Sequence, residues 1–236
     1  MPIKKGGGVA ALILAMTYIF GFVLFFGLLD PSSNTTPQTR LAFIVQNRDA
    51  FFAGYVVIGV LFSFTLILLV QSLYTWLKPF SPELMKYAAV VGMLWSFIVL
   101  ASSFVFLTSL GVLAKYEVTD PVQALTISNT VNIFVDALGG GIELVGAIWV
   151  LLISYVGIRY RVLYQALHYI GLVVGVSGVL TLFSGLSFLS TNSFFDITTA
   201  LFGLGQIVWF FVLGISMLRH VNTEQKANYS TVASNL

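Results

Sequence analysis

The sequence predicts an all-α, polytopic membrane protein: a six-transmembrane-helix bundle with both termini cytoplasmic. The 236 residues are 58% hydrophobic and only 8% charged, whereas a soluble domain carries about 25% charged residues. The apolar residues fall in continuous runs, and a helix of roughly 20 such residues crosses a hydrocarbon core about 30 Å thick. Transmembrane barrels show alternating strands of about ten residues instead. Helices are therefore the expected spanning elements.

Six apolar runs are long enough to span. They are Val9–Leu29, Phe51–Trp76, Tyr87–Val112, Val131–Ile158, Leu163–Leu189 and Phe194–Leu218. The first run follows two lysines, as in a signal peptide, but it exceeds the usual apolar length of about 7–15 residues and no A-x-A cleavage site follows, so we expect a retained helix. The transmembrane domain is thus predicted over residues 1–218, with a polar cytoplasmic tail at 219–236.

Basic residues predict the orientation, because lysine and arginine are concentrated in cytoplasmic connections. One side of the membrane receives eight of them, namely Lys4, Lys5, Lys78, Lys86, Arg159, Arg161, Arg219 and Lys226, and the other side receives Arg40, Arg48 and Lys115. The first and third connections, both external, are the longer ones. In the first of these, residues 40–51 are predicted either as a short interfacial helix or as an extension of the second span. In the third connection, Asp120-Pro121 predicts a turn or a helix start.

Carboxylates within two of the predicted spans are the candidate functional residues. Asp136 and Glu143 are seven residues apart in the fourth span, so on a continuous helix they share a face and lie about 10 Å apart. Asn132 and Gly140 lie close to that face. The sixth span adds a related face, which consists of Asp196, Thr199 and Gln206. Acidic residues at membrane depth are costly and usually face protein or water.

Two interpretations of these polar residues stay open. They could form a polar cleft, open outward, for a cation or a proton. They could instead form an interhelical hydrogen-bond network in which Glu143 is protonated, with Asp196 acting only as a helix cap.

Small residues predict where helices approach closely. The fifth span carries Gly171, Gly175 and Gly178 on one face, and the fourth span carries Gly139–Gly141. Helix contact is the expected role of these glycines. For Gly139–Gly141 the alternative is a local break in the helix that lines a cavity.

Several classes of function are excluded or lack support. The chain has no cysteine, which excludes disulfides, thiolate metal sites and cysteine nucleophiles. No catalytic or metal-binding motif is found, so catalytic and metal-ligating residues are predicted as none and an enzyme is not expected. No basic cluster indicates nucleic-acid binding. The sequence indicates no cofactor, and the identity of any cofactor remains unknown.

Three segments resemble a known family. They are SLYTWLKP (Ser72–Pro79), the glycine-rich stretch Gly139–Gly178, and LGQIVWFFVLGISMLR (Leu204–Arg219). The order of these segments along the chain resembles that in a family of small bacterial six-span membrane proteins, which is catalogued as a domain of unknown function. The resemblance implies a six-helix fold in the bacterial inner (plasma) membrane. It implies no activity and no site residues.

The best-supported function from the sequence is a small cation- or proton-linked transporter or channel that uses the carboxylate face. The alternative is a non-catalytic accessory or assembly subunit, in which the same residues hold helices together. The expected partners are the lipid bilayer and either other membrane subunits or further copies of the chain. The deciding observation is whether Glu143 faces a cavity, another helix or lipid.

Overall fold

The structure is a computed structural model that describes residues 3–29, 36–140, 143–188 and 193–234, with side chains described as far as His220. Every element in these residues is a helix. In chain order they are α1 (Ile3–Phe22), η1 (Val23–Leu28), α2 (Pro37–Gln46), α3 (Arg48–Tyr55), η3 (Val56–Leu61), α4 (Phe62–Leu77), α5 (Pro82–Thr119), α6 (Pro121–Val135), η4 (Asp136–Gly140), α7 (Leu144–Tyr160), α8 (Gln165–Thr181), η5 (Leu182–Gly185) and α9 (Phe194–Ser234). The segments η1, η3 and η4 are π-helical.

Five of the apolar helical stretches are long enough to cross a membrane. They are Ile3–Leu28, Arg48–Leu77, Pro82–Thr119, Gln165–Gly185 and Phe194–His220, and Leu144–Tyr160 is a shorter apolar helix. The all-α prediction is therefore confirmed for the described residues. The chain is a multi-pass integral membrane protein.

The predicted fourth span is wrong as a single continuous helix. The chain forms α6, then the π-helical η4, and α7 begins only at Leu144. Residues 141–142, which include Gly141, lie outside the described residues. Each glycine in a helix interior costs about 1 kcal/mol relative to alanine, so the run that begins at Gly139 weakens the helix at one point. Of the two roles left open for these glycines, the local break agrees with Glu143, which is not helical and precedes the first turn of α7.

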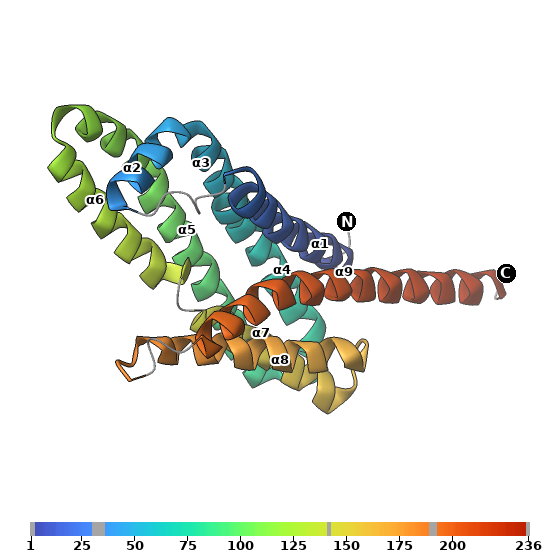
Figure 1. Cartoon of the computed structure of the whole chain (residues 1–236). Coiled ribbons are helices and arrows are strands. Elements are labelled where there is room, and N and C mark those ends of the chain that lie inside the picture. The colour runs from blue at the N-terminus through green and yellow to red at the C-terminus, as the bar shows by residue number, and fades with distance from the viewer. Residues whose placement is uncertain (1–2, 30–35, 141–142, 189–192, 235–236) are drawn as a thin grey trace.

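Six helices form a closed ring. Helix α1 packs against α4, α4 against α5, α5 against α7, α7 against α8, α8 against α9, and α9 returns to α1 (Figure 1). Aromatic side chains fill the middle of the ring. Trp149 lies between Trp95 and Trp209, with ring centroids 5.8 and 5.7 Å apart. Phe210 stacks on Trp95 at 6.3 Å. This layer connects α5, α7 and α9 through one buried core.

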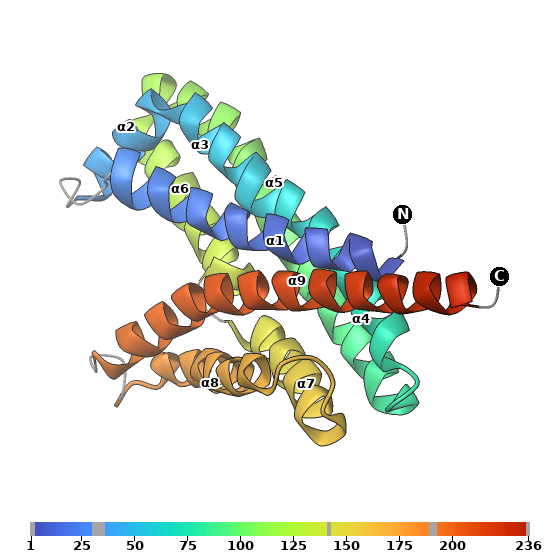
Figure 2. The ribbon, with the colours of Figure 1, turned by 90° about the vertical axis from the view of Figure 1, so that its right-hand side faces the viewer.

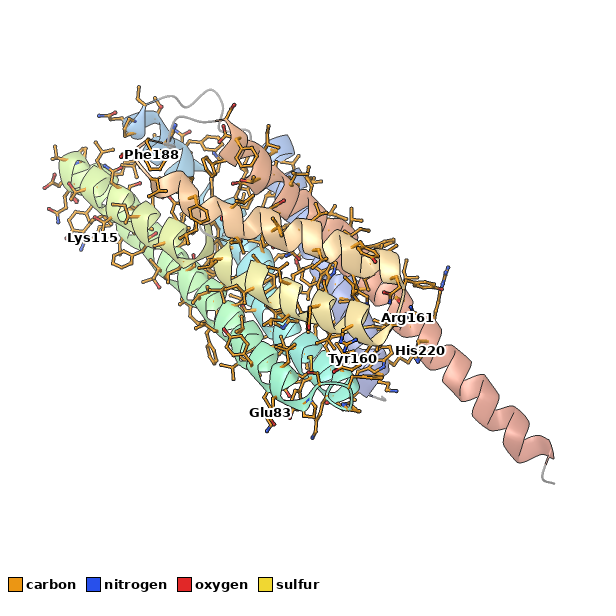
Figure 3. The ribbon with its side chains drawn as sticks, turned by 90° about the horizontal axis from the view of Figure 1, so that it is seen from below. Glu83, Lys115, Tyr160, Arg161, Phe188 and His220 are labelled. Carbon is orange, nitrogen blue, oxygen red and sulfur yellow. The ribbon has the colours of Figure 1, made fainter. Side chains whose placement is uncertain are left out.

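Both chain ends lie at the same end of the ring (Figure 2). The Lys4 ammonium lies 5.3 Å from the ring centroid of Trp76. The ring centroids of Trp76 and His220 are 5.2 Å apart. In Figure 3, Glu83, Tyr160, Arg161 and His220 lie at this end, whereas Lys115 and Phe188 lie at the other. We call the first the basic end and the second the far end. Helix α9 continues past Arg219 to Ser234 without a break, so the predicted tail begins within a helix.

A small lobe extends from the ring at the far end. Helix α5 has 38 residues, which is about 57 Å at 1.5 Å per residue and well beyond a hydrocarbon core of about 30 Å. Helices α2 and α6 pack against its last turns, and the contact buries Leu41, Leu113 and Ala124. Helix α2 is distinct from α3, because Asn47 ends it and a Thr36–Thr39 capping box begins it. The short-helix alternative for this connection is the one observed.

Glycines on α8 lie where this helix touches both of its neighbours. A Cβ atom on Gly171 would overlap Ser154 Oγ of α7 and lie 2.6 Å from Trp209 Nε1 of α9. A Cβ atom on Gly178 would lie 2.6 Å from Phe202 Cε2 and 2.7 Å from Ala147 Cβ. Gly175 faces α7 in the same way, since a Cβ atom there would lie 2.7 Å from Leu151 Cδ2 and 3.1 Å from the Ala147 carbonyl oxygen. The backbones of α7, α8 and α9 can approach this closely only because these positions carry no side chain.

Candidate functional site

A cavity of about 250 Å³ lies between α1, α4, α5 and Glu143, the residue directly before α7. Its lining comes from four separate parts of the chain: Thr17, Tyr18, Gly21, Phe22, Phe25, Phe26, Ile58, Phe62, Trp95, Val99 and Glu143. The residues from α1 and η1 belong to the half of that helix away from Lys4. The cavity therefore lies in the half of the ring toward the far end.

Among the described residues, Glu143 is the only acidic one that lines this cavity. It occupies the N-cap position of α7, with φ −89° and ψ 13°, and its side chain makes no capping hydrogen bond. Its backbone N–H donates to Thr181 Oγ1 at 3.1 Å, and that hydroxyl donates to the Gly178 carbonyl at 2.7 Å. The buried threonine of α8 thus fixes the backbone at the break, and the Glu143 carboxyl group is left to face the cavity.

Glu143 lies at the positive end of the α7 helix dipole. A helix N-terminus carries a partial positive charge and exposed N–H groups, and Glu143 lies directly before the first turn of α7. Within the described part of the chain, no side chain donates a hydrogen bond to its carboxylate. The phenol of Tyr18 lies close enough to interact with it electrostatically.

Aromatic rings form most of the remaining wall. Tyr18 meets Phe62 edge-on, with centroids 5.7 Å apart, and Phe62 meets Trp95 edge-on at 5.5 Å. Phe22 stacks on Phe26 at 5.5 Å toward the far end. The inner side of the cavity is closed, because Phe62 and Trp95 are buried in the core. The outer rim is open, since Phe26 is 74% exposed.

π-helical turns border the cavity on two sides. Phe25 and Phe26 belong to η1, and Ile58 belongs to η3. A third π-helical segment, η4, ends at Gly140, three residues before Glu143 in the sequence. π-Helical segments are rare in proteins overall. Where they do occur, they are often found at functional sites. Three π-helical segments therefore lie in the same half of the ring, and this makes the cavity the candidate functional site.

The other acidic residues predicted from the sequence do not line this cavity. Asp136 and Asn132 are exposed, on η4 and α6 respectively. The face that Asp136 was expected to share with Glu143 requires a continuous helix, which the break interrupts. Asp196 and Thr199 are exposed near the start of α9, where Thr199 Oγ1 donates to the Phe195 carbonyl at 2.9 Å.

Gln206 is fully buried, with 0% of its surface exposed. Neither its amide nitrogen nor its amide oxygen has a hydrogen-bond partner among the described residues. Gln206 lies four residues before Phe210 of the aromatic layer, which is about 6 Å along α9. Glu143 likewise lies three residues before Gly146, and Gly146 contacts Trp95 of the same layer. Gln206 and Glu143 are therefore on the same side of the aromatic layer. Gln206 is not part of the cavity wall.

Comparison with known families agrees with the resemblance noted in the sequence. Residues 7–215 match the family described as Domain of unknown function (DUF4386). The chain belongs to the DUF4386 family. The match begins in α1 and ends in α9, so the DUF4386 region includes the whole ring and every residue of the cavity. Neither a curated protein nor a solved structure matches the chain.

Sequence reasoning missed the aromatic part of this DUF4386 site. Tyr18 lies 14 residues after Lys4, about 21 Å along the helix, and Trp95 lies nine residues after Lys86, about 14 Å along. Tyrosine and tryptophan usually gather at the membrane interfaces. Tyr18 and Trp95 instead lie deep within apolar spans, and this unusual depth could have identified them from the sequence. Thr181 carried no comparable signal, because hydroxyl side chains commonly bond within their own helix.

Proposed function

We propose that this DUF4386 protein is a cation- or proton-linked transporter or channel, with Glu143 at its site. The observation that carries the proposal is that Glu143 lines a cavity directly before the start of α7. Non-helical backbone at membrane depth is tolerated where it is buried in protein or lines a cavity. Broken helices at the binding site are a recurring device of membrane transporters.

A role for Glu143 as structural glue has less support. A carboxyl group at membrane depth costs at least about 2.5–3.5 kcal/mol, and interhelical hydrogen bonds would offset this cost. The residues of the described cavity wall are mainly aromatic, and none of them donates a hydrogen bond to the Glu143 side chain. Its backbone N–H already holds α7 to α8 through Thr181, and this contact does not require an acidic side chain.

The proposal includes an orientation. The basic end carries Lys4, Lys78, Arg161 and Arg219, and lysine and arginine favour the cytoplasmic side. We therefore place both termini in the cytoplasm of a bacterial cell, in the inner membrane. The cavity then opens toward the external side, because its rim at Phe26 lies toward the far end.

The test is Glu143→Gln in proteoliposomes, with proton and monovalent-cation flux as the readout. Glutamine keeps the size and the hydrogen-bonding groups of glutamate but can neither ionise nor release a proton. We expect the variant to fold like the wild type and to lose flux by at least about tenfold. Asp196→Asn is the matched control, because it removes an exposed carboxylate outside the cavity, and it should retain wild-type flux.

Two results would contradict the proposal. One is wild-type flux that does not exceed that of empty vesicles. The other is a Glu143→Gln variant that transports like the wild type.

A non-catalytic accessory subunit is the second candidate, and one surface favours it. The outer part of α5 and the facing side of α6 form a shallow apolar hollow of about 480 Å³, lined by Phe104, Val105, Thr108, Ser109, Val112, Ile127 and Val131. Nearby, Ile133 is 69% exposed and Phe134 is 54% exposed. The accessory role predicts no flux from the chain alone, so the same assay separates the two candidates.

A further inference from the structure

We infer that the Glu143 cavity binds a small organic ammonium ion, such as a quaternary or alkylated amine, by enclosing it between aromatic rings and one carboxylate. This inference deepens the proposed function and rests on it for the location of the site. It names the chemical class of the occupant. The arrangement of Tyr18, Phe62, Trp95 and Glu143 carries it.

The wall provides two kinds of attraction for a cation. The faces of aromatic rings carry partial negative charge, and tryptophan and tyrosine attract ammonium groups most strongly. Tyr18, Phe62 and Trp95 form an unbroken series of rings, with centroids 5.7 and 5.5 Å apart, and all three line the cavity. Glu143 adds a carboxyl group to the same wall, and this group attracts a cation when it is ionised.

The donor set fits an organic ammonium ion better than a metal ion. Calcium takes six to eight oxygen ligands, and magnesium takes six in octahedral geometry. The cavity offers one carboxylate, and the only other side-chain oxygens in its described lining are the hydroxyls of Thr17 and Tyr18. Among the described residues, no three histidine, aspartate or glutamate side chains gather at one place. An alkylated ammonium needs no such ligands, since its surface is largely apolar.

The size and the rim of the cavity agree with this occupant. Its volume of about 250 Å³ equals that of about eight water molecules at ~30 Å³ each and is below the ~300–1,000 Å³ of drug-sized sites. A cationic head group with short alkyl substituents fits this space. The stacked pair Phe22–Phe26 lies at the open rim, so longer alkyl substituents can extend past it. A proton alone would require no cavity of this size.

The test is direct binding to the purified full-length protein in lipid nanodiscs, measured by isothermal titration calorimetry. The probes are tetraethylammonium and choline, with sodium and 3,3-dimethyl-1-butanol, the uncharged isostere of choline, as comparisons. We expect both ammonium ions to bind, and sodium and the neutral isostere to bind at least about tenfold more weakly. Glu143→Gln and Tyr18→Leu should each weaken ammonium binding by about tenfold or more.

Phe97→Leu is the matched control. Phe97 lies two residues from Trp95 on the same helix, but it is 62% exposed and outside the cavity, so ammonium affinity should not change. Trp95 itself is a poor target because its truncation also opens the core, and Tyr18, at the edge of that core, takes its place. Size-exclusion chromatography of each variant verifies the fold.

The inference is overturned if no organic ammonium ion binds, if the neutral isostere binds equally well, or if affinity survives in both Glu143→Gln and Tyr18→Leu. Its failure is distinguishable from that of the proposed function. Ammonium binding that depends on Glu143, without any flux, supports the inference and contradicts transport. Proton flux that depends on Glu143, without ammonium binding, supports transport and contradicts the inference.

Discussion

Replacing Gly171 by leucine is expected to destabilise the bundle by about 3 kcal/mol or more, at the upper end of the cost of overpacking a core. The first atom of the new side chain would overlap Ser154 Oγ and lie 2.6 Å from Trp209 Nε1. Both neighbours are fully buried, with 0% exposure, so neither can swing into open space. Helices α7, α8 and α9 would have to separate. Thermal unfolding of the purified protein in detergent measures the effect.

Gly111→Leu is the control for this change. Gly111 is an exposed position on α5 with no atom within 4 Å of a Cβ placed there. Leucine forms helices more readily than glycine by about 0.8–1 kcal/mol. This variant should therefore melt at or slightly above the wild-type temperature. A Gly171→Leu protein that unfolds together with Gly111→Leu would contradict the close packing of α8.

Trp149→Ala is the second substitution with a large expected effect on stability. Trp149 is 1% exposed and lies between Trp95 and Trp209 in the middle of the ring. Truncation of a large buried aromatic side chain costs about 3–5 kcal/mol, because it leaves a cavity that the surroundings fill only partly. We expect a clear loss of thermostability, measured by size-exclusion chromatography after heating.

Phe97→Ala removes an aromatic ring from the outside of α5, where the side chain is 62% exposed, and should change stability little. If Trp149→Ala and Phe97→Ala lose stability equally, the aromatic layer does not hold the ring together.

The sequence was sufficient to predict the membrane helices themselves. Length and continuous hydropathy identify a spanning helix, because the bilayer sets both requirements. The same reasoning failed at the fourth span. A window of about 20 residues averages over a short interruption, so Val131–Ile158 looks continuous although α6 packs on the outer part of α5 and α7 packs in the ring. The run Gly139–Gly141 was the local signal of the break.

The site was only partly predictable for a related reason. Glu143 could be identified because acidic residues at membrane depth are rare and costly. Asp136 was grouped with it by helical periodicity, which holds only within one uninterrupted helix. Tyr18, Phe62 and Trp95 come from three different helices. Their meeting around Glu143 depends on the order of helices in the ring, and no spacing within the sequence encodes that order.

Single-cysteine accessibility tests most directly whether Glu143 faces an open cavity that receives a cation. The chain has no cysteine of its own, so Glu143→Cys carries a unique thiol. The reagent is a small methanethiosulfonate that bears a quaternary ammonium group, applied to the protein in nanodiscs so that both faces are reachable. Gln206→Cys is the matched comparison, because Gln206 lies on the same side of the aromatic layer but is 0% exposed.

We expect the thiol of Glu143→Cys to react, tetraethylammonium to slow that reaction, and the thiol of Gln206→Cys to stay unmodified. An open cavity at Glu143 is contradicted if Glu143→Cys is inert while a cysteine at the exposed position Thr119 is modified, or if Glu143→Cys and Gln206→Cys react at the same rate.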